Sequence, residues 1–148
     1  MNTDEKVAKL MTLLKEKGYK YTDKRKAMVE LLVTEDRYIT AKYVSETVGR
    51  VYPGLSFDTI YRNLNTYEEL GLLETTEMNG EKYFKIGCLD AGHHHHHHIC
   101  LRCGRAKNIH IDVCKNLNIP ELEGYRIDDH KFEIYGVCPS CLAKDMDK

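Results

Sequence analysis

Apolar side chains recur at helical spacing in the stretch DEKVAKLMTLLKEKG, near the start of the chain. Val7, Leu10, Met11 and Leu14 fall on one face of a helix, with acidic residues before them and Gly18 after them. Acids suit the first turn of a helix, and glycine commonly follows its last turn. The pattern therefore predicts a first helix that ends near Gly18.

Three further helices are predicted, each preceded by a residue whose hydroxyl group can cap it. Thr22, Thr40 and Ser56 stand at these positions, and a side-chain oxygen there can accept from a free backbone N–H of the first turn. The fourth helix also has Asp58 in its first turn and Gly71 beyond its end. The faces predicted to be buried are Ala27, Met28, Leu31 and Leu32 in the second helix, Ala41, Val44 and Val48 in the third, and Ile60, Leu64 and Tyr67 in the fourth.

The fourth helix is followed by LLETTEMNGEKYFKI, in which two β-prone runs flank Asn79-Gly80. This dipeptide between two such runs is the strongest short-range signal for a hairpin with a type I′ turn. Helices followed by a hairpin, in this order, predict a winged helix-turn-helix, and the hairpin would be the wing.

The rest of the chain alternates short β-like runs at residues 93–103, 106–111 and 125–138 with one helical candidate near 112–119. We predict a small α+β domain here. The fold class is therefore α+β, with an N-terminal winged helix-turn-helix and a smaller C-terminal domain.

The composition is that of a globular protein, with 42% hydrophobic and 30% charged residues among 148. No apolar run approaches the roughly 20 residues that span a bilayer, and the N-terminal stretch does not resemble a secretory signal. We expect a cytoplasmic protein without a membrane partner. The net charge of −1 argues against indiscriminate binding of nucleic acid, but residues 17–26 hold five basic side chains and one acid.

All six cysteines and all eight histidines fall at or after Cys88. Four of the cysteines form two Cys-x-x-Cys pairs, Cys100 with Cys103 and Cys138 with Cys141. In a reducing compartment such pairs are more often metal ligands than disulfides, and four thiolates suit a closed tetrahedral zinc site. The alternative is four unconnected reduced cysteines.

The run of six histidines at 93–98 leads directly into the first of these pairs, which argues that it is not an affinity tag. Successive side chains of a strand point to opposite faces, so one strand could supply imidazoles to two metal sites. The alternative is a solvated loop that binds metal adventitiously. Cys88 could complete a site with the histidines or be a small buried side chain. His110 and Cys114 are likewise isolated. His130 begins an evident strand in DDHKFEIYG and could be a metal ligand or a surface residue.

The fourth helix carries Tyr61, Arg62 and Asn65 on its other face. These residue types read base edges or hold phosphates in a major groove, although polar helix faces are common. No HExxH, GxSxG or deaminase-type HxE motif occurs, so the sequence offers neither a catalytic centre nor a small-molecule substrate.

Three segments together resemble the ferric uptake regulator family of metal-sensing repressors. They are SFDTIYRNLNTYEELGLL, the histidine run leading into CLRCG, and DDHKFEIYGVCPSC. The resemblance covers roughly residues 10–142. It implies a homodimer that binds double-stranded operator DNA, with a winged-helix domain at 1–87, a hinge at 88–92, and a dimerisation and metal-binding domain at 93–148.

The resemblance also implies roles for individual residues, each at a position that matches the family pattern. The implied structural zinc ligands are Cys100, Cys103, Cys138 and Cys141. The implied regulatory zinc ligands are Cys88, His95, His97 and Glu77. A second site in the dimerisation domain would use His94, His96 and His130, with Cys114, His110 or Asp112 as the fourth ligand. The implied DNA contacts are Tyr61, Arg62, Asn65, Lys20 and Arg25.

Three departures from the family pattern bear on the metal. Tyr38 stands where iron and peroxide sensors usually place a histidine, and Asn108 stands where they place an acid. Cys88 replaces a carboxylate, and a thiolate favours zinc over iron(II) because it is the softer ligand. The sequence therefore predicts a zinc-sensing repressor. The alternatives are an iron, manganese or peroxide sensor and a zinc buffer without specific DNA binding.

Overall fold

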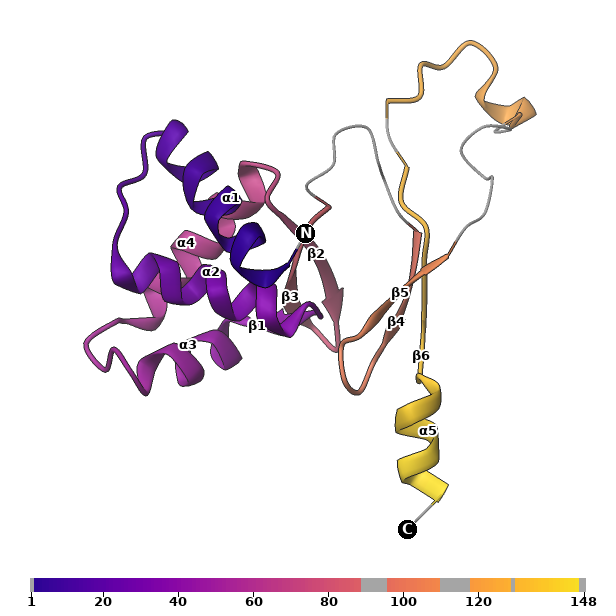
Figure 1. Ribbon diagram of the computed structural model, residues 1–148. Helices are drawn as coiled ribbons and strands as arrows, with labels where there is room; N and C mark the ends of the chain where they lie inside the picture. The colour runs from indigo at the N-terminus through magenta and orange to yellow at the C-terminus, as the bar shows by residue number, and fades with distance from the viewer. Residues whose placement is uncertain (1, 89–95, 110–117, 129, 147–148) are drawn as a thin grey trace. The chain divides into compact units, whose positions relative to one another are not determined.

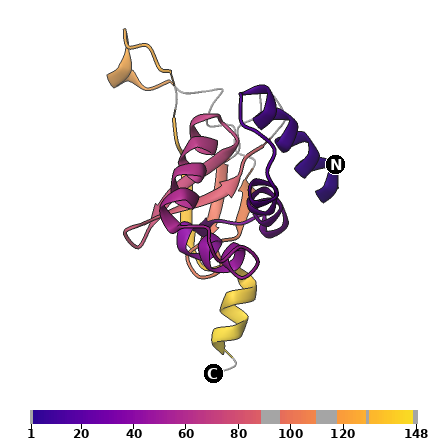
Figure 2. The same cartoon turned by 90° about the vertical axis from the view of Figure 1, so that its left-hand side faces the viewer.

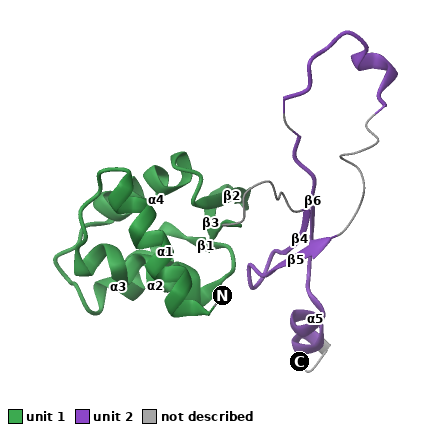
Figure 3. Cartoon of the chain, turned by 45° about the horizontal axis from the view of Figure 1, so that its top comes forward, with its two compact units in different colours: residues 1–91 green, residues 92–148 purple. Residues whose placement is uncertain are grey.

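The computed structural model describes all residues except 1, 89–95, 110–117, 129 and 147–148. The chain forms two compact units, residues 1–91 and 92–148 (Figure 3). Their boundary falls inside the interval 88–92 assigned to a hinge, and the hinge itself stays a prediction. Each unit is described by itself below.

Unit 1 contains four helices and a small sheet, and its helices gather on one side of that sheet (Figures 1 and 2). In chain order its elements are α1 (Thr3–Glu16), α2 (Asp23–Glu35), β1 (Ile39–Thr40), α3 (Ala41–Gly49), α4 (Phe57–Glu69), β2 (Leu73–Met78) and β3 (Glu81–Ile86).

The predicted capping residues begin three of these helices. Thr22 accepts a hydrogen bond from the backbone N–H of Arg25 at 3.0 Å, Thr40 does so from Tyr43 at 3.1 Å, and Ser56 from Thr59 at 3.2 Å. Each bond satisfies one of the free N–H groups at a helix start, so the sequence itself fixes where α2, α3 and α4 begin.

The predicted hairpin is present as β2 and β3, which pair antiparallel from Leu73 opposite Ile86 to Met78 opposite Glu81. Asn79 and Gly80 both have positive φ angles, 55° and 77°. A type I′ turn requires this at both central residues, and Asn-Gly tolerates it. The two-residue strand β1 adds to the free edge of β3 and completes a three-stranded sheet in the order β1-β3-β2.

One apolar core joins the helices to the sheet, and the predicted helix faces mostly supply it. The α2 face needs a correction, because its buried residues are Met28, Val29, Leu32 and Val33. Ala27 and Leu31 pack at the edge of the core instead. The fully buried members from the other elements include Leu10, Leu14, Val44, Ile60, Leu64, Tyr67 and Phe84.

Unit 2 contains a three-stranded sheet in the order β5-β4-β6, in which β4 pairs antiparallel with β5 and parallel with β6. Its elements are β4 (His96–Cys100), β5 (Ala106–Ile109), a 3-10 turn (Pro120–Leu122), β6 (Glu133–Gly136) and α5 (Pro139–Met146).

The sequence prediction for unit 2 was wrong in two places. His130 does not begin a strand, because β6 starts only at Glu133. Helix α5, which directly follows Cys138, was not foreseen. The helical candidate at 112–119 falls mostly outside the described residues. No helix in the described parts of the chain is long and apolar enough to cross a membrane.

Candidate metal centre and nucleic-acid interface

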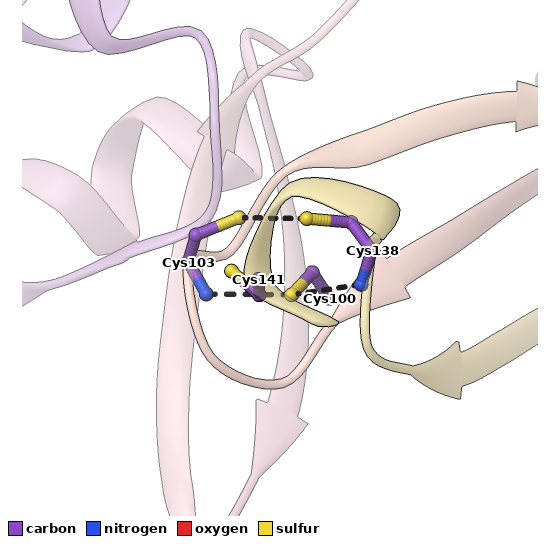
Figure 4. A group of neighbouring side chains, drawn as sticks. All are labelled: Cys100, Cys103, Cys138 and Cys141. Atoms are coloured by element: carbon purple, nitrogen blue, oxygen red, sulfur yellow. Dashed lines mark hydrogen bonds between the residues drawn. The ribbon is translucent and has the colours of Figure 1, made fainter. Parts of the chain in front are cut away.

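The four paired cysteines meet in unit 2, where their side chains point toward one another (Figure 4). Cys100 ends β4 and Cys103 lies in the turn after it, while Cys138 and Cys141 lie before and within α5. The turn and the helix start therefore bring together two pairs that are far apart in the chain. All four sulfur atoms lie within 4.8 Å of one another.

The spacing of these sulfur atoms fits a tetrahedral zinc ion. A tetrahedron with Zn–S bonds of roughly 2.3 Å has edges of about 3.8 Å. The distance from Cys103 Sγ to Cys138 Sγ is 3.8 Å, and the other separations do not exceed 4.8 Å. The donor set, its spacing and its half-buried position suit a closed structural site.

The protein also supplies N–H groups that stabilise thiolate at this centre. Burial opposes ionisation of Cys100, but backbone N–H groups of Cys103, Cys138 and Arg102 outweigh it and lower the pKa of Cys100 to about 6. The Cys103 and Cys138 nitrogens lie 3.5 and 3.4 Å from Cys100 Sγ. The hydrogen bond with Cys138 raises the pKa of Cys141 to about 12. Four adjacent thiols cannot all ionise unaided, whereas a divalent cation makes the fully ionised set favourable.

The histidine run continues into β4, so its described residues His96, His97 and His98 lie on a strand. His96 and His97 are both buried, which is unusual for histidine and argues against a solvated loop for these two residues. His97 pairs with Asn108 of β5 and with Glu133 of β6. His93, His94 and His95 lie outside the described residues.

Two ligands predicted for the second site lie together in unit 2. The ring centroids of His96 and His130 are 5.3 Å apart, and Phe132 contacts His96 edge-on at 5.7 Å. His94 and the three candidates for the fourth ligand, His110, Asp112 and Cys114, fall outside the described residues. The site thus stays a prediction that rests on one observed histidine pair.

The predicted regulatory ligands come from both units. In unit 1, Glu77 is an exposed residue of β2 and Cys88 is half-buried just after β3; in unit 2, His97 is buried in β4. His95 lies outside the described residues, so this ligand set also stays a prediction. Tyr38, which stands at the histidine position of other sensors, is buried in unit 1.

The face of α4 that the sequence assigned to DNA is accessible. Arg62 is exposed, Tyr61 is 39% exposed, and Phe57 one turn earlier is 47% exposed. The Phe57 and Tyr61 rings stack at a centroid distance of 6.0 Å, and Tyr61 meets Phe84 of β3 edge-on at 6.3 Å. The strand β3 therefore supports the aromatic side of α4.

The two basic residues predicted to bind DNA have different surroundings. Lys20 is exposed in the loop between α1 and α2. The Arg25 guanidinium lies 5.7 Å from the centre of the Tyr19 ring and donates a hydrogen bond to the backbone carbonyl of Lys20. Arg25 therefore holds the loop that carries Lys20, a role that sequence reasoning missed.

Sequence reasoning also missed Lys82 of β3. Its ammonium group contacts both Asn65 and Glu68 of α4. No local pattern could have revealed this contact, because it depends on how the wing packs against the helix.

Comparison with known proteins identifies relatives that span nearly the whole chain. The family model described as the ferric uptake regulator family matches residues 16–135. A ferric uptake regulation protein of Staphylococcus aureus (strain Mu50) is 50% identical over 142 residues, covering 95% of this chain and 98% of the relative. One of the same name from Staphylococcus epidermidis (strain ATCC 12228) is 46% identical over 145 residues, covering 97% and 99%.

Solved structures share the fold at lower identity. A zinc uptake regulator complexed with zinc and DNA matches with a TM-score of 0.75 at 20% identity, and 99% of each chain is covered. The Helicobacter pylori ferric uptake regulator, described as having three functional metal binding sites, matches with a TM-score of 0.67 at 19% identity, covering 96% of this chain and 95% of that one. These matches support the N-terminal winged helix and the C-terminal α+β domain.

Proposed function

The chain belongs to the ferric uptake regulator family, and from this premise we propose that it is a metal-dependent transcriptional repressor that binds double-stranded operator DNA as a homodimer. The observation that carries the proposal is the exposed face of α4 with Tyr61 and Arg62, backed by the β2–β3 wing. An exposed helix with these side chains fits a major groove. We assign no enzymatic activity, and repression places the protein in the cytoplasm.

The surface of unit 2 supports the homodimer. Among its described residues, the buried apolar side chains are limited to Ile99, Cys100 and Cys141. A small unit that leaves so many apolar side chains exposed is expected to cover them with a second copy. The exposed ones are Leu101, Ile119, Tyr125, Ile127, Phe132, Ile134, Tyr135 and Leu142.

We further propose zinc as both the structural and the regulatory metal. The Cys100–Cys103–Cys138–Cys141 cluster fits zinc in donor type and spacing. For the regulatory site, the thiol of Cys88 supports zinc over iron(II), because soft ligands select soft or borderline metals. This makes the chain a zinc uptake regulator that controls zinc uptake genes.

The proposed ligand set suggests how repression responds to metal. Zinc at this site would supply a coordinate link between residues of the two units. Glu77 and Cys88 belong to unit 1, whereas His95 and His97 belong to unit 2, so joint ligation would restrict the orientation of the winged helix. Zinc binding that selects one orientation increases DNA affinity only if that orientation fits the operator. Operator DNA must then increase the affinity for zinc by the same factor by which zinc increases the affinity for DNA.

The names of the relatives favour a second candidate, an iron sensor. Both staphylococcal proteins are called ferric uptake regulation proteins and are 50% and 46% identical to this chain. A manganese or peroxide sensor would share the same DNA-binding unit. A zinc buffer, by contrast, would bind metal without selecting any DNA sequence.

One experiment separates these candidates. Operator sequences are first selected from a random duplex library, and anisotropy then follows their binding to protein stripped of regulatory metal. Zinc, iron(II) and manganese are titrated through metal buffers, with the iron series kept anaerobic. Zinc alone restoring tight binding supports the zinc sensor. Iron or manganese doing so would replace it, and failure to select any sequence would indicate a buffer.

A further inference from the structure

Lys82 joins the wing to the recognition helix through two polar contacts. Its Nζ donates to Oδ1 of Asn65 at 2.9 Å and to Oε1 of Glu68 at 2.8 Å. The same Nζ lies 5.3 Å from the centre of the Phe84 ring, on the same side of β3. Lys82 and Glu68 are each about one-third exposed, so this cluster lies at the edge of the DNA-binding face.

The charge of Lys82 is already matched within the protein. Glu68 forms an ion pair with Lys82 and also accepts a hydrogen bond from the Thr75 hydroxyl, so side chains of β3 and β2 hold this carboxylate of α4. An ammonium group with a carboxylate at 2.8 Å has its charge compensated and is a poor partner for a phosphate. Lys82 thus differs from exposed lysines such as Lys20.

Lys82 also decides which way the amide of Asn65 faces. An ammonium group only donates hydrogen bonds, so it must meet the carbonyl oxygen of the amide and not its NH2 group. This fixes the orientation by chemistry, independent of how the two amide atoms are assigned. Among the described residues, Nδ2 of Asn65 has no hydrogen-bond acceptor.

Asn65 lies on the same side of α4 as Tyr61 and Arg62, which are four and three residues earlier. Asparagine reads adenine when its oxygen accepts from N6 and its NH2 donates to N7. With Oδ1 held by Lys82, the NH2 group of Asn65 points away from Lys82 and is the donor that the side chain offers to other partners. The partners open to it are an acceptor on a base edge, such as purine N7, guanine O6 or thymine O4, and a phosphate oxygen.

We propose that Lys82 is a positioning residue that sets DNA specificity by holding Asn65 as a hydrogen-bond donor toward an acceptor atom of the operator. The inference rests on the proposed DNA-binding function and adds a role for a wing residue that need not touch DNA. It predicts that Lys82 acts through Asn65, so the two residues are energetically coupled.

The test uses the full-length, zinc-loaded protein and the random duplex library. Binding is measured for Lys82→Met, Asn65→Ala and the double variant, and circular dichroism checks that each is folded. Lys85→Met is the matched control, because Lys85 lies on the same strand but pairs with Asp36 at 3.3 Å. Asn65→Asp supplies a side chain of the same shape without a donor.

We expect Asn65→Ala and Asn65→Asp each to lower operator affinity about tenfold, the effect of losing one hydrogen bond to a polar or charged acceptor. Lys82→Met should weaken binding as well, and the double variant should be no weaker than Asn65→Ala. If the acceptor is a base, Lys82→Met alters preference at one base pair, with adenine gaining. If affinity instead falls equally on all sequences, the acceptor is a phosphate, and the role of Lys82 in DNA specificity is overturned.

Independent effects would overturn the inference. If Lys82 itself contacts a phosphate, the affinity losses of Lys82→Met and Asn65→Ala multiply in the double variant. Lys82→Met then also lowers the slope of log affinity against log salt concentration by about one. Wild-type affinity and preference in both single variants would also overturn it, since the contact would then be structural only. A wild-type protein that selects no sequence would instead overturn the proposed function and this inference with it.

Discussion

Replacing Cys138 by serine should unfold unit 2 and leave unit 1 folded. The two units differ in what holds them together. Unit 1 has a continuous apolar core that connects all four helices to the sheet. The described part of unit 2 buries Ile99, Cys100 and Cys141 and little else that is apolar, so its thiolate centre supplies most of its cohesion.

The magnitudes support this asymmetry. A unit the length of residues 92–148 has an expected stability of about 3–9 kcal/mol, and one the length of residues 1–91 about 5–14 kcal/mol. Structural zinc sites have apparent binding free energies of about 10–16 kcal/mol, which count as folding free energy. Loss of this term exceeds what unit 2 has available but does not act on unit 1.

Hydrogen exchange read by mass spectrometry distinguishes the units peptide by peptide. In Cys138→Ser, peptides from β4, β5 and β6 should exchange at unprotected rates while those from α2 and α4 keep wild-type protection, and the zinc content should fall. Cys88→Ser is the matched control, because it removes a thiol outside the cluster. Both units of this variant should keep wild-type protection from exchange. Wild-type protection of unit 2 in zinc-free Cys138→Ser would refute the reasoning.

Four further outcomes are expected. Phe84→Ala should lower the free energy of unfolding by about 3–5 kcal/mol in urea titrations, because Phe84 is fully buried; a loss below 1 kcal/mol would contradict the packing. Arg62→Ala should weaken operator binding and reduce its salt slope by about one if it holds a phosphate, with zinc content unchanged in a metal assay on the same sample. Cys88→Ser should abolish zinc-dependent DNA binding yet keep the dimer in sedimentation, and retained zinc dependence would exclude it as a ligand. A hydrogen bond from Tyr43 lowers the pKa of Glu35 in the folded protein. The ionised carboxylate therefore stabilises the fold at pH values above the pKa it has in the unfolded chain, and this stabilisation is lost as the pH falls through the lower folded pKa. Glu35→Gln should make the free energy of unfolding depend less on pH below about pH 5.

The parts of the fold that were predictable are those set by local chemistry. Thr22, Thr40 and Ser56 mark helix starts because each capping bond joins residues three apart. Asn79-Gly80 marks the turn because few other pairs tolerate two positive φ angles. These signals are complete within a few residues, so no tertiary context was needed to interpret them.

The missed features depend on contacts between distant segments. Strand β1 has two residues and exists because β3 offers a free edge, which Ile39 and Thr40 alone cannot reveal. Helix α5 is short and begins at Pro139, inside the second cysteine pair. The cysteine centre itself was predictable from spacing, because the Cys-x-x-Cys pattern encodes ligand geometry, but the Lys82–Asn65 contact joins residues 17 apart and has no such pattern.

The cysteine centre has a further consequence for how this chain can vary. Cys103 and Cys138 are 35 residues apart, so a metal ion held by the four thiolates would close a loop that contains β5 and β6, the strand parallel to β4. Loop-closure entropy grows only with the logarithm of length, and doubling such a loop costs about 0.6 kcal/mol. The register of β4 against β6 is anchored at the pair Cys100 and Gly136, because Cys100 is itself a proposed ligand and Cys138 follows Gly136 by two residues. Insertions and deletions between the two cysteine pairs that spare β5, β6 and the predicted ligands should therefore be tolerated, while the anchored end keeps its geometry.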